Sequence, residues 1–250
     1  MTLWLTAVEI RGHEFRERAR YPFNIASFQQ SRTLTFSTPV SFFVGENGSG
    51  KSTLVQALAH RCGLDLWAQP KRRLRAGELP PTALAAYLEV ALQNGPVRGG
   101  LFSAEVFRNW AEFLDDVTEI DPGQAKYHGC SRLTYRSHGE GILAYLRGRY
   151  RTPGLYFLDE PESALSPASQ LELLRILDGF GRSGQAQFVI ATHSPILMAL
   201  PESRIFHFSD SGISETDYAS TEHFRLYRDF LDNPGSFVAG PYGMRPPSSV

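Results

Sequence analysis

The residues of this sequence best suited to chemistry form one glycine-rich run, Gly45-Glu46-Asn47-Gly48-Ser49-Gly50-Lys51-Ser52-Thr53. The run matches the phosphate-binding pattern G-x-x-x-x-G-K-[ST], with an apolar segment before it and a helical pattern after it. Glycines let the backbone N–H groups curl around phosphate oxygens, and the N-terminus of the next helix adds its dipole. Lys51 is expected to neutralise the β- and γ-phosphates of a nucleoside triphosphate, and Ser52 to coordinate Mg²⁺.

Two acids, Asp159 and Glu160, follow a second apolar segment, residues 155–158. A buried strand there would deliver both to the carboxyl end of a sheet, where ligands of open α/β folds bind. Asp159 is then expected to hold Mg²⁺, directly or through water, and Glu160 to polarise an attacking water as general base. Such a pair alone can be a plain strand end, but its place behind a phosphate loop favours a functional role.

A histidine, His193, closes a third apolar segment that covers residues 188–191. A single histidine is more often structural than catalytic. This one, however, ends the strand that should lie beside the strand of Asp159, so its imidazole can reach the γ-phosphate. The sequence therefore predicts a catalytic site made of Lys51, Glu160 and His193.

Strands and helices must alternate to position these residues. Apolar runs bounded by turn residues predict strands over 3–10, 33–36, 40–44, 155–158, 188–191 and 204–208. Helical patterns cover 51–61, 103–120, the stretch from the N-cap pair Ser166-Pro167 to 178–179, and 221–231. The alternation predicts an α/β fold, with a mostly parallel sheet covered by helices on both faces.

The chain is expected to divide into three parts. Residues 1–62 and 142–218 would form the nucleotide-binding core. Residues 63–141, with Pro- and Gly-rich breaks, would form an inserted, mainly helical lobe. Residues 219–250 would form a C-terminal helix and a loose tail.

Composition narrows the function classes. The 250 residues are 42% hydrophobic, which suits a globular protein with a real core, and no apolar run is long enough to cross a bilayer. Two cysteines without metal-ligand spacing, and no secretory signal, favour the cytoplasm. The formal net charge of −1 gives no global attraction to nucleic acid. Basic clusters at 71–75 and 147–151 fit solvated surface or contact with an acidic partner.

The phosphate loop, the acid pair and the histidine, in this order, resemble the ABC-type ATPases. Ser137-His138-Gly139-Glu140 resembles the family's signature, in which Ser137 and Gly139 would bind the γ-phosphate. Residues 162–166 resemble the loop that communicates across the family's dimer interface. The resemblance implies ATP and Mg²⁺ as ligands and a head-to-tail homodimer, in which the signature of one subunit closes over nucleotide held by the other.

The resemblance also implies details of fold and site. The fold would be a P-loop NTPase of the ABC type, with an antiparallel N-terminal β part and a small helical inserted lobe. Either Glu105 or Gln93 would take the place of the family's glutamine, and either Tyr21 or Phe23 would stack on adenine. His138, Glu140 and Ser166 depart from the family's usual glycine, glutamine and aspartate.

Three functions fit these features. The first is a stand-alone soluble ATPase, related to defence or DNA-repair engines. The second is the ATP-binding subunit of a transporter whose membrane-protein partner is a separate chain. The third is a non-hydrolysing switch, which the presence of Glu160 disfavours. A nucleic-acid partner is compatible with the first function, although the net charge does not support it.

Overall fold

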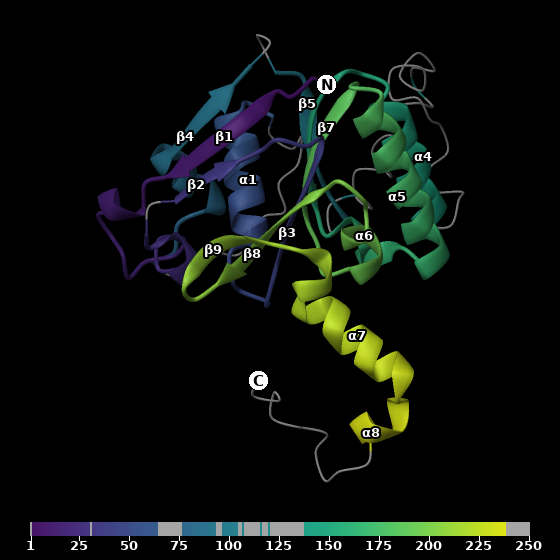
Figure 1. Ribbon diagram of the computed structural model, residues 1–250. Helices are drawn as coiled ribbons and strands as arrows, with labels where there is room; N and C mark the ends of the chain where they lie inside the picture. Colours follow the sequence, from purple (N-terminus) through teal and green to yellow (C-terminus); the bar gives the residue numbers. More distant parts are fainter. Residues whose placement is uncertain are drawn as a thin grey trace.

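The computed structural model describes residues 2–30, 32–64, 77–93, 97–104 and 138–238, together with residues 107, 116 and 120. Two sheets and a set of helices make up this part of the chain (Figure 1). The strands are β1 (Leu5–Ile10), β2 (Arg32–Thr35), β3 (Val40–Gly45), β4 (Leu88–Leu92), β5 (Gly99–Ser103), β6 (Gly154–Asp159), β7 (Ala186–Ala191), β8 (Arg204–Ser209) and β9 (Gly212–Thr216). The α-helices are α1 (Lys51–Arg61), α4 (His138–Arg149), α5 (Pro167–Arg182), α6 (Pro195–Met198), α7 (Glu222–Asp232) and α8 (Pro234–Val238). Short 3-10 turns are η1 (Gly12–Glu14), η2 (Ala26–Phe28), η3 (Pro81–Tyr87), η5 (Pro161–Ala164) and η6 (Tyr218–Ser220).

The larger sheet has the strand order β5-β6-β7-β3-β8-β9 and is parallel except for its last strand, β9. Its register aligns the carboxyl ends of the central strands, because Ala191 of β7 lies opposite both Phe43 of β3 and Asp159 of β6. The smaller sheet, β2-β1-β4, is antiparallel. The predicted α/β fold with a mostly parallel sheet and an antiparallel N-terminal part is confirmed.

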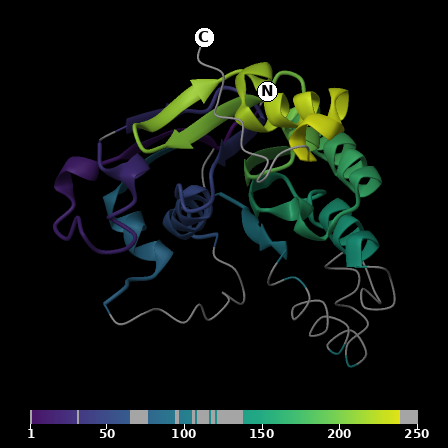
Figure 2. The same ribbon diagram turned by 90° about the horizontal axis from the view of Figure 1, so that it is seen from below.

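The two faces of the larger sheet pack against different layers. Successive side chains of a strand point to opposite faces, and β3 follows this rule. Phe43 joins one core with α1 and the smaller sheet, whereas Phe42 and Val44 join a second core with α4, α5 and α6. Figure 2 shows α1 almost along its axis, with the smaller sheet and the larger sheet on either side of it.

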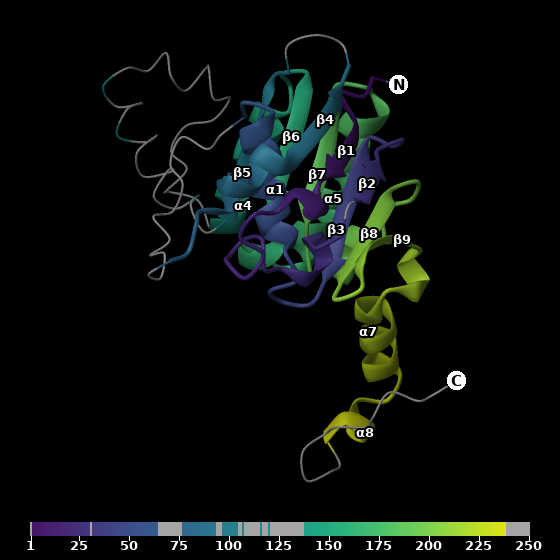
Figure 3. The same cartoon turned by 90° about the vertical axis from the view of Figure 1, so that its left-hand side faces the viewer.

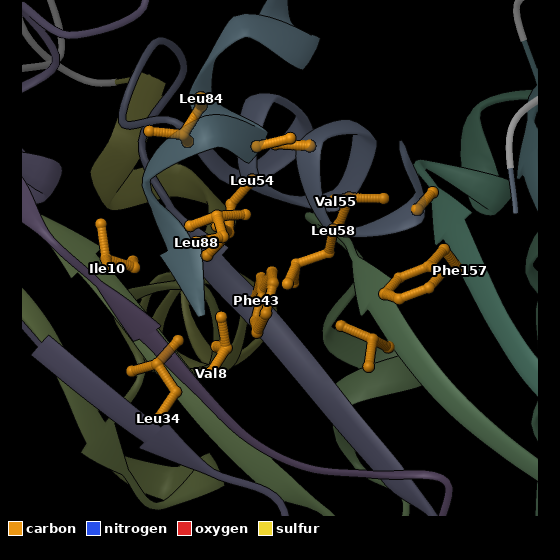
Figure 4. Close-up of a cluster of buried hydrophobic side chains, with 14 of the residues drawn as sticks. Val8, Ile10, Leu34, Phe43, Leu54, Val55, Leu58, Leu84, Leu88 and Phe157 are labelled. Carbon is orange, nitrogen blue, oxygen red and sulfur yellow. The ribbon is translucent and has the colours of Figure 1, made fainter. Parts of the chain in front are cut away.

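The first core is built around α1. Leu54 and Leu58 of this helix lie above Phe43 of the larger sheet and beside Val8 and Leu88 of the smaller sheet (Figure 4). All five side chains are at most 2% exposed. Burial of a leucine or phenylalanine side chain contributes about 1.5–3 kcal/mol, so these contacts hold the helix that follows the phosphate loop in place.

The prediction of a mainly helical lobe over 63–141 is wrong for two segments. β4 pairs with β1, and β5 pairs with β6, so both strands belong to the sheets of the core. Their partners are distant in sequence, and a local helical pattern cannot reveal such pairing. Ser103, expected to begin a helix, is instead the last residue of β5. Residues 65–76, 94–96 and most of 105–137 lie outside the described residues, so the rest of the proposed lobe stays a prediction.

Two predicted helix starts are confirmed. α1 begins at Lys51, directly after Gly50, whose backbone is left-handed with φ 105°. α5 begins after Ser166, whose hydroxyl accepts a hydrogen bond from the Ser169 N–H at 3.2 Å. This helix runs to Arg182, beyond the predicted end at 178–179. The extension packs closely, because a Cβ at Gly181 would lie 3.2 Å from Pro39.

The C-terminal helix α7 projects away from the two sheets (Figures 1 and 3). Only its start is covered, since residues 225–230 are all exposed. The predicted tail from residue 240 lies outside the described residues. Among the residues that the structure describes, no helix is long and apolar enough to span a membrane.

Candidate functional site

The phosphate loop joins β3 to α1, and two of its glycines, Gly45 and Gly50, are required because neighbouring atoms approach them closely. A Cβ at Gly45, with φ 140°, would lie 2.4 Å from the Phe208 carbonyl oxygen of the neighbouring strand β8. A Cβ at Gly50 would lie 2.6 Å from the Phe28 ring. The Ser27 hydroxyl donates a hydrogen bond to the Ser49 carbonyl at 2.7 Å. The loop is therefore fixed from both sides, as preorganised phosphate binding requires.

Lys51 is the cation of this loop and is only 4% exposed. Its ammonium group donates to the carbonyl oxygens of Gly45 and Glu46, at 2.8 and 2.9 Å. Burial lowers the pKa of Lys51, while the carboxylates of Glu160, Glu46 and Asp159 act in the opposite direction. The Lys51 ammonium thus interacts electrostatically with Glu46, which follows β3, and with the acid pair at the end of β6.

The acid pair lies at the end of β6. Asp159 is 8% exposed, and the Gln56 amide of α1 donates to its Oδ2 at 3.2 Å. Glu160 has a left-handed backbone, with φ 46° and ψ 55°, and its N–H donates to the Ala191 carbonyl at 3.0 Å. That conformation costs a non-glycine residue about 1–2 kcal/mol. Asp159 is therefore the last residue of the strand, whereas the left-handed backbone of Glu160 turns the chain out of it.

His193 follows β7 and is anchored by a glutamate. Oε1 of Glu162 accepts hydrogen bonds from the His193 N–H at 2.6 Å and from the Thr192 hydroxyl at 2.7 Å. Burial raises the pKa of Glu162, and these two hydrogen bonds oppose the rise. Glu162, which the family resemblance places only in the interface loop, therefore also holds His193 in position, a role that no sequence pattern predicts.

A second histidine, His223 of α7, reaches the same place. Its Nε2 lies 3.2 Å from Nδ1 of His193, and the ring centroids are 5.4 Å apart. Burial lowers the pKa of both imidazoles, and Lys51 lowers both further. No spacing pattern in the sequence connects His223 to the phosphate loop, so its place beside His193 becomes visible only in the structure.

The two adenine-stacking candidates have different surroundings. Phe23 is buried in an aromatic cluster, with its ring 5.0 Å from that of Phe15 and 5.1 Å from that of Tyr87. Phe23 is therefore a core residue, and this assignment is withdrawn. The hydroxyl of Tyr21 lies 3.0 Å from Oγ1 of Thr53, in the first turn of α1. Tyr21 is thus the candidate that lies beside the phosphate loop.

The two candidates for the family's glutamine, Gln93 and Glu105, occupy different parts of the chain relative to the phosphate loop. The Gln93 N–H donates to the Trp4 carbonyl at 2.8 Å, and the Trp4 N–H donates to Gln187 near the start of β7. Gln93 therefore lies near the amino end of the parallel sheet, opposite to the phosphate loop. Glu105 lies outside the described residues. It follows β5, whose last residue, Ser103, is level with Asp159.

The signature segment is described only from His138 onward, and Ser137 lies outside the described residues. Gly139 is in the first turn of α4, where a Cβ would lie 3.4 Å from the Ala164 carbonyl oxygen. The start of α4 therefore packs against the loop of residues 162–166. Ser166, which departs from the family's aspartate, caps α5.

The donor groups fit a magnesium ion bound with a triphosphate. The Ser52 hydroxyl and the Asp159 carboxylate are hard oxygen ligands of the kind that Mg²⁺ prefers. The ammonium of Lys51 is near four acids, Glu46, Asp159, Glu160 and Glu162. A triphosphate adds further negative charge, so an additional cation is needed to balance the site.

Two family models match, one described as "AAA domain" over residues 23–65 and one described as "AAA domain, putative AbiEii toxin, Type IV TA system" over residues 141–199. The first covers the phosphate loop, and the second covers Asp159, Glu160 and His193.

Curated relatives include a "Putative ABC transporter ATP-binding protein" of Streptomyces coelicolor, which is 29% identical over 60% of this chain and 57% of its own length. The zinc import ATP-binding protein ZnuC of Saccharophagus degradans is 26% identical over 74% of this chain and 72% of its own length. The chain therefore spans less than two thirds of the first relative.

Among solved structures, the SMC head domain from Thermotoga maritima superposes with a TM-score of 0.50 at 18% identity, over 86% of this chain and 99% of that one. At this identity the likeness concerns the fold alone. Two parts of the chain thus match AAA-domain models, and the curated relatives are ATP-binding proteins, so the chain is similar to ATP-binding proteins of the ABC type.

Proposed function

We propose that this protein hydrolyses ATP to ADP and phosphate, and that it does so as a stand-alone soluble ATPase of the cytoplasm. One observation carries the proposal. β3, β6 and β7 are neighbours in register, so Lys51, Asp159 and His193 follow strand ends at the same edge of the sheet. Charge interactions also connect these strand ends, since the carboxylate of Glu160 raises the pKa of both Lys51 and His193, against the lowering by burial.

Each residue then has a defined task. The loop N–H groups and Lys51 hold the β- and γ-phosphates, and Tyr21 stands beside the first turn of α1. Mg²⁺, held by Ser52 and Asp159, supplies charge neutralisation to the phosphates. Glu160 polarises the attacking water as general base, and the His193 imidazole binds the γ-phosphate.

The proposal includes a head-to-tail dimer with two ATP molecules between its subunits. Ser137 and Gly139 of the segment 63–141 would bind the γ-phosphate held by the other subunit. Within one subunit the start of α4 packs against the loop of residues 162–166, so the two segments that the resemblance assigns to the dimer surface lie side by side. Closure would depend on the γ-phosphate and reverse after hydrolysis.

The test is phosphate release and oligomeric state of the Glu160→Gln variant. We expect turnover to fall by about two orders of magnitude or more, while ATP binding persists and the protein accumulates as a dimer with Mg-ATP. Glu202→Gln is a matched control, because Glu202 also has positive φ, 58°, and is exposed. Unchanged turnover in Glu160→Gln would contradict the base assignment, and a monomer in ATP would contradict the dimer.

A second candidate function is the ATP-binding subunit of a transporter, with separate membrane subunits. The names of both curated relatives favour it. Capture of partners by the Glu160→Gln protein in its native cell separates the two functions. A membrane protein in the capture supports the transporter function. A stand-alone enzyme would be recovered without one, and ATPase activity raised by DNA with steep salt dependence would indicate a nucleic-acid partner.

A further inference from the structure

The structure contains a histidine pair at the nucleotide site that no feature of the phosphate-loop pattern calls for. We propose that His223 is a positioning residue: its Nε2–H donates to Nδ1 of His193 and so keeps the His193 proton on Nε2, where it can bind the γ-phosphate. The inference rests on the proposed function, because it concerns how His193 is prepared for ATP.

The environment of His193 limits the tautomers that can work. Its Nε2 is buried and has no hydrogen-bond partner among the residues that the structure describes. Besides His223 itself, the charges that act on the ring come from Lys51, Glu160 and Glu46, which belong to the phosphate loop and the end of β6. Nε2 is therefore the nitrogen left for the nucleotide.

Phosphate chemistry then assigns the proton. A γ-phosphate oxygen is a hydrogen-bond acceptor, so Nε2 of His193 must carry the proton in order to bind it. A neutral imidazole has one proton, so Nδ1 is then an acceptor that needs a donor. The ring nitrogen of His223 at 3.2 Å fills this need. A fixed tautomer keeps every molecule in the form that can donate to the γ-phosphate.

His223 is itself held in place by the start of α7. Thr221, which is 2% exposed, accepts a hydrogen bond from the Phe224 N–H at 3.2 Å and donates one to the Tyr218 carbonyl at 2.7 Å. The Tyr218 and Phe224 rings pack 4.7 Å apart. The capped first turn thus fixes His223, and the positive end of the helix dipole disfavours a second proton on its ring.

Two substitutions separate positioning from folding. His223→Leu removes the donor, and His223→Gln keeps an N–H donor on a side chain of similar reach. We expect His223→Leu to lower kcat roughly tenfold, the worth of one hydrogen bond, with the KM for ATP changed by less than about threefold. His223→Gln is expected to restore most of kcat, and the exposed His13→Leu is the matched control.

The tautomer itself can be measured without turnover. In the wild-type protein, ¹⁵N spectra of the imidazole rings should show His193 protonated at Nε2, and His223→Leu should show a mixture. A proton on Nδ1 of His193 in the wild type would overturn the inference, as would normal kcat in His223→Leu. If the wild type binds ATP but does not hydrolyse it, the proposed function fails while the tautomer measurement still decides this inference.

Discussion

The proposed nucleotide site has two walls that are built in different ways. One wall is the phosphate loop, a continuous run from Gly45 to Thr53 in which a Cβ at Gly45 or Gly50 would clash with a neighbouring segment. The other wall combines residues from three separate segments, Glu160 with Glu162, His193, and His223. Glu162 accepts hydrogen bonds from the Thr192 hydroxyl and the His193 N–H, and the ring nitrogens of His193 and His223 lie 3.2 Å apart. The first wall is a local motif, whereas the second is formed by tertiary contacts. Substitutions in the two walls should therefore have different effects on ATP binding, stability and turnover.

The largest effect is expected at the cation of the first wall. Lys51→Ala removes the buried ammonium that faces the phosphates, which should weaken ATP binding by about 3 kcal/mol, roughly a hundredfold. Calorimetric titration with Mg-ATP measures it. Arg182→Ala, on the exposed end of α5, is the control and should bind normally. Normal ATP affinity in Lys51→Ala would show that the loop is not part of the ATP-binding site.

The glycines of the same wall provide a matched pair. Gly45→Ala would place its Cβ 2.4 Å from the Phe208 carbonyl, whereas a Cβ at Gly48 meets nothing within 4 Å. Both positions have positive φ, which costs alanine about 1–2 kcal/mol. We expect Gly48→Ala to lose about that much stability in urea unfolding, and Gly45→Ala clearly more. Equal losses would show that the contact with β8 does not shape the loop.

The second wall should respond through its hydrogen bonds. Glu162→Ala leaves the Thr192 hydroxyl and the His193 N–H without their acceptor, which should cost about 1–3 kcal/mol of stability in urea unfolding. The variant should also lower kcat, because His193 loses its anchor. Ser163→Ala, one residue away and exposed, is the control, with an expected loss below about 1 kcal/mol. A Glu162→Ala protein as stable and active as this control would refute the bracing role.

The smallest effect is a pH dependence of stability from the histidine pair. Burial lowers the pKa of His193 and of His223 from 6.5. The unfolded chain therefore binds protons more readily, so this contribution is present above pH 6.5 and is lost as the pH falls below it. The surrounding charged groups are Lys51, Glu46, Glu160, Glu222 and His207. Urea unfolding measures the free energy of unfolding at pH 7.5 and at pH 5.5. Between these pH values, a variant with both histidines changed to glutamine should lose less of this free energy than the wild type. An equal loss would count against neutral imidazoles.

Sequence reasoning succeeded where chemistry and local pattern coincide. Lys51, Asp159 and His193 each follow an apolar strand, and the parallel sheet brings strand ends of this kind together. The start of α1 at Lys51 was predicted because a phosphate loop must lead directly into a helix.

The other residues of the site could not be predicted from the sequence, because their positions depend on packing between distant segments. Glu162 and His223 are each about thirty residues from their partner in the second wall. Strands β4 and β5 were missed for the same reason, since β4 pairs with the N-terminal strand β1 and β5 with β6. Phe23 and Tyr21 looked equivalent in sequence, and only the aromatic cluster around Phe23 separated them.

The most direct test of the two-wall site is a crystal structure of the Glu160→Gln protein with ATP and Mg²⁺. We expect the γ-phosphate to lie about 3 Å from both the Lys51 ammonium and Nε2 of His193, with the metal between Ser52 and Asp159. A nucleotide bound elsewhere, or a γ-phosphate that contacts the loop while His193 stays out of hydrogen-bond range, would contradict the account.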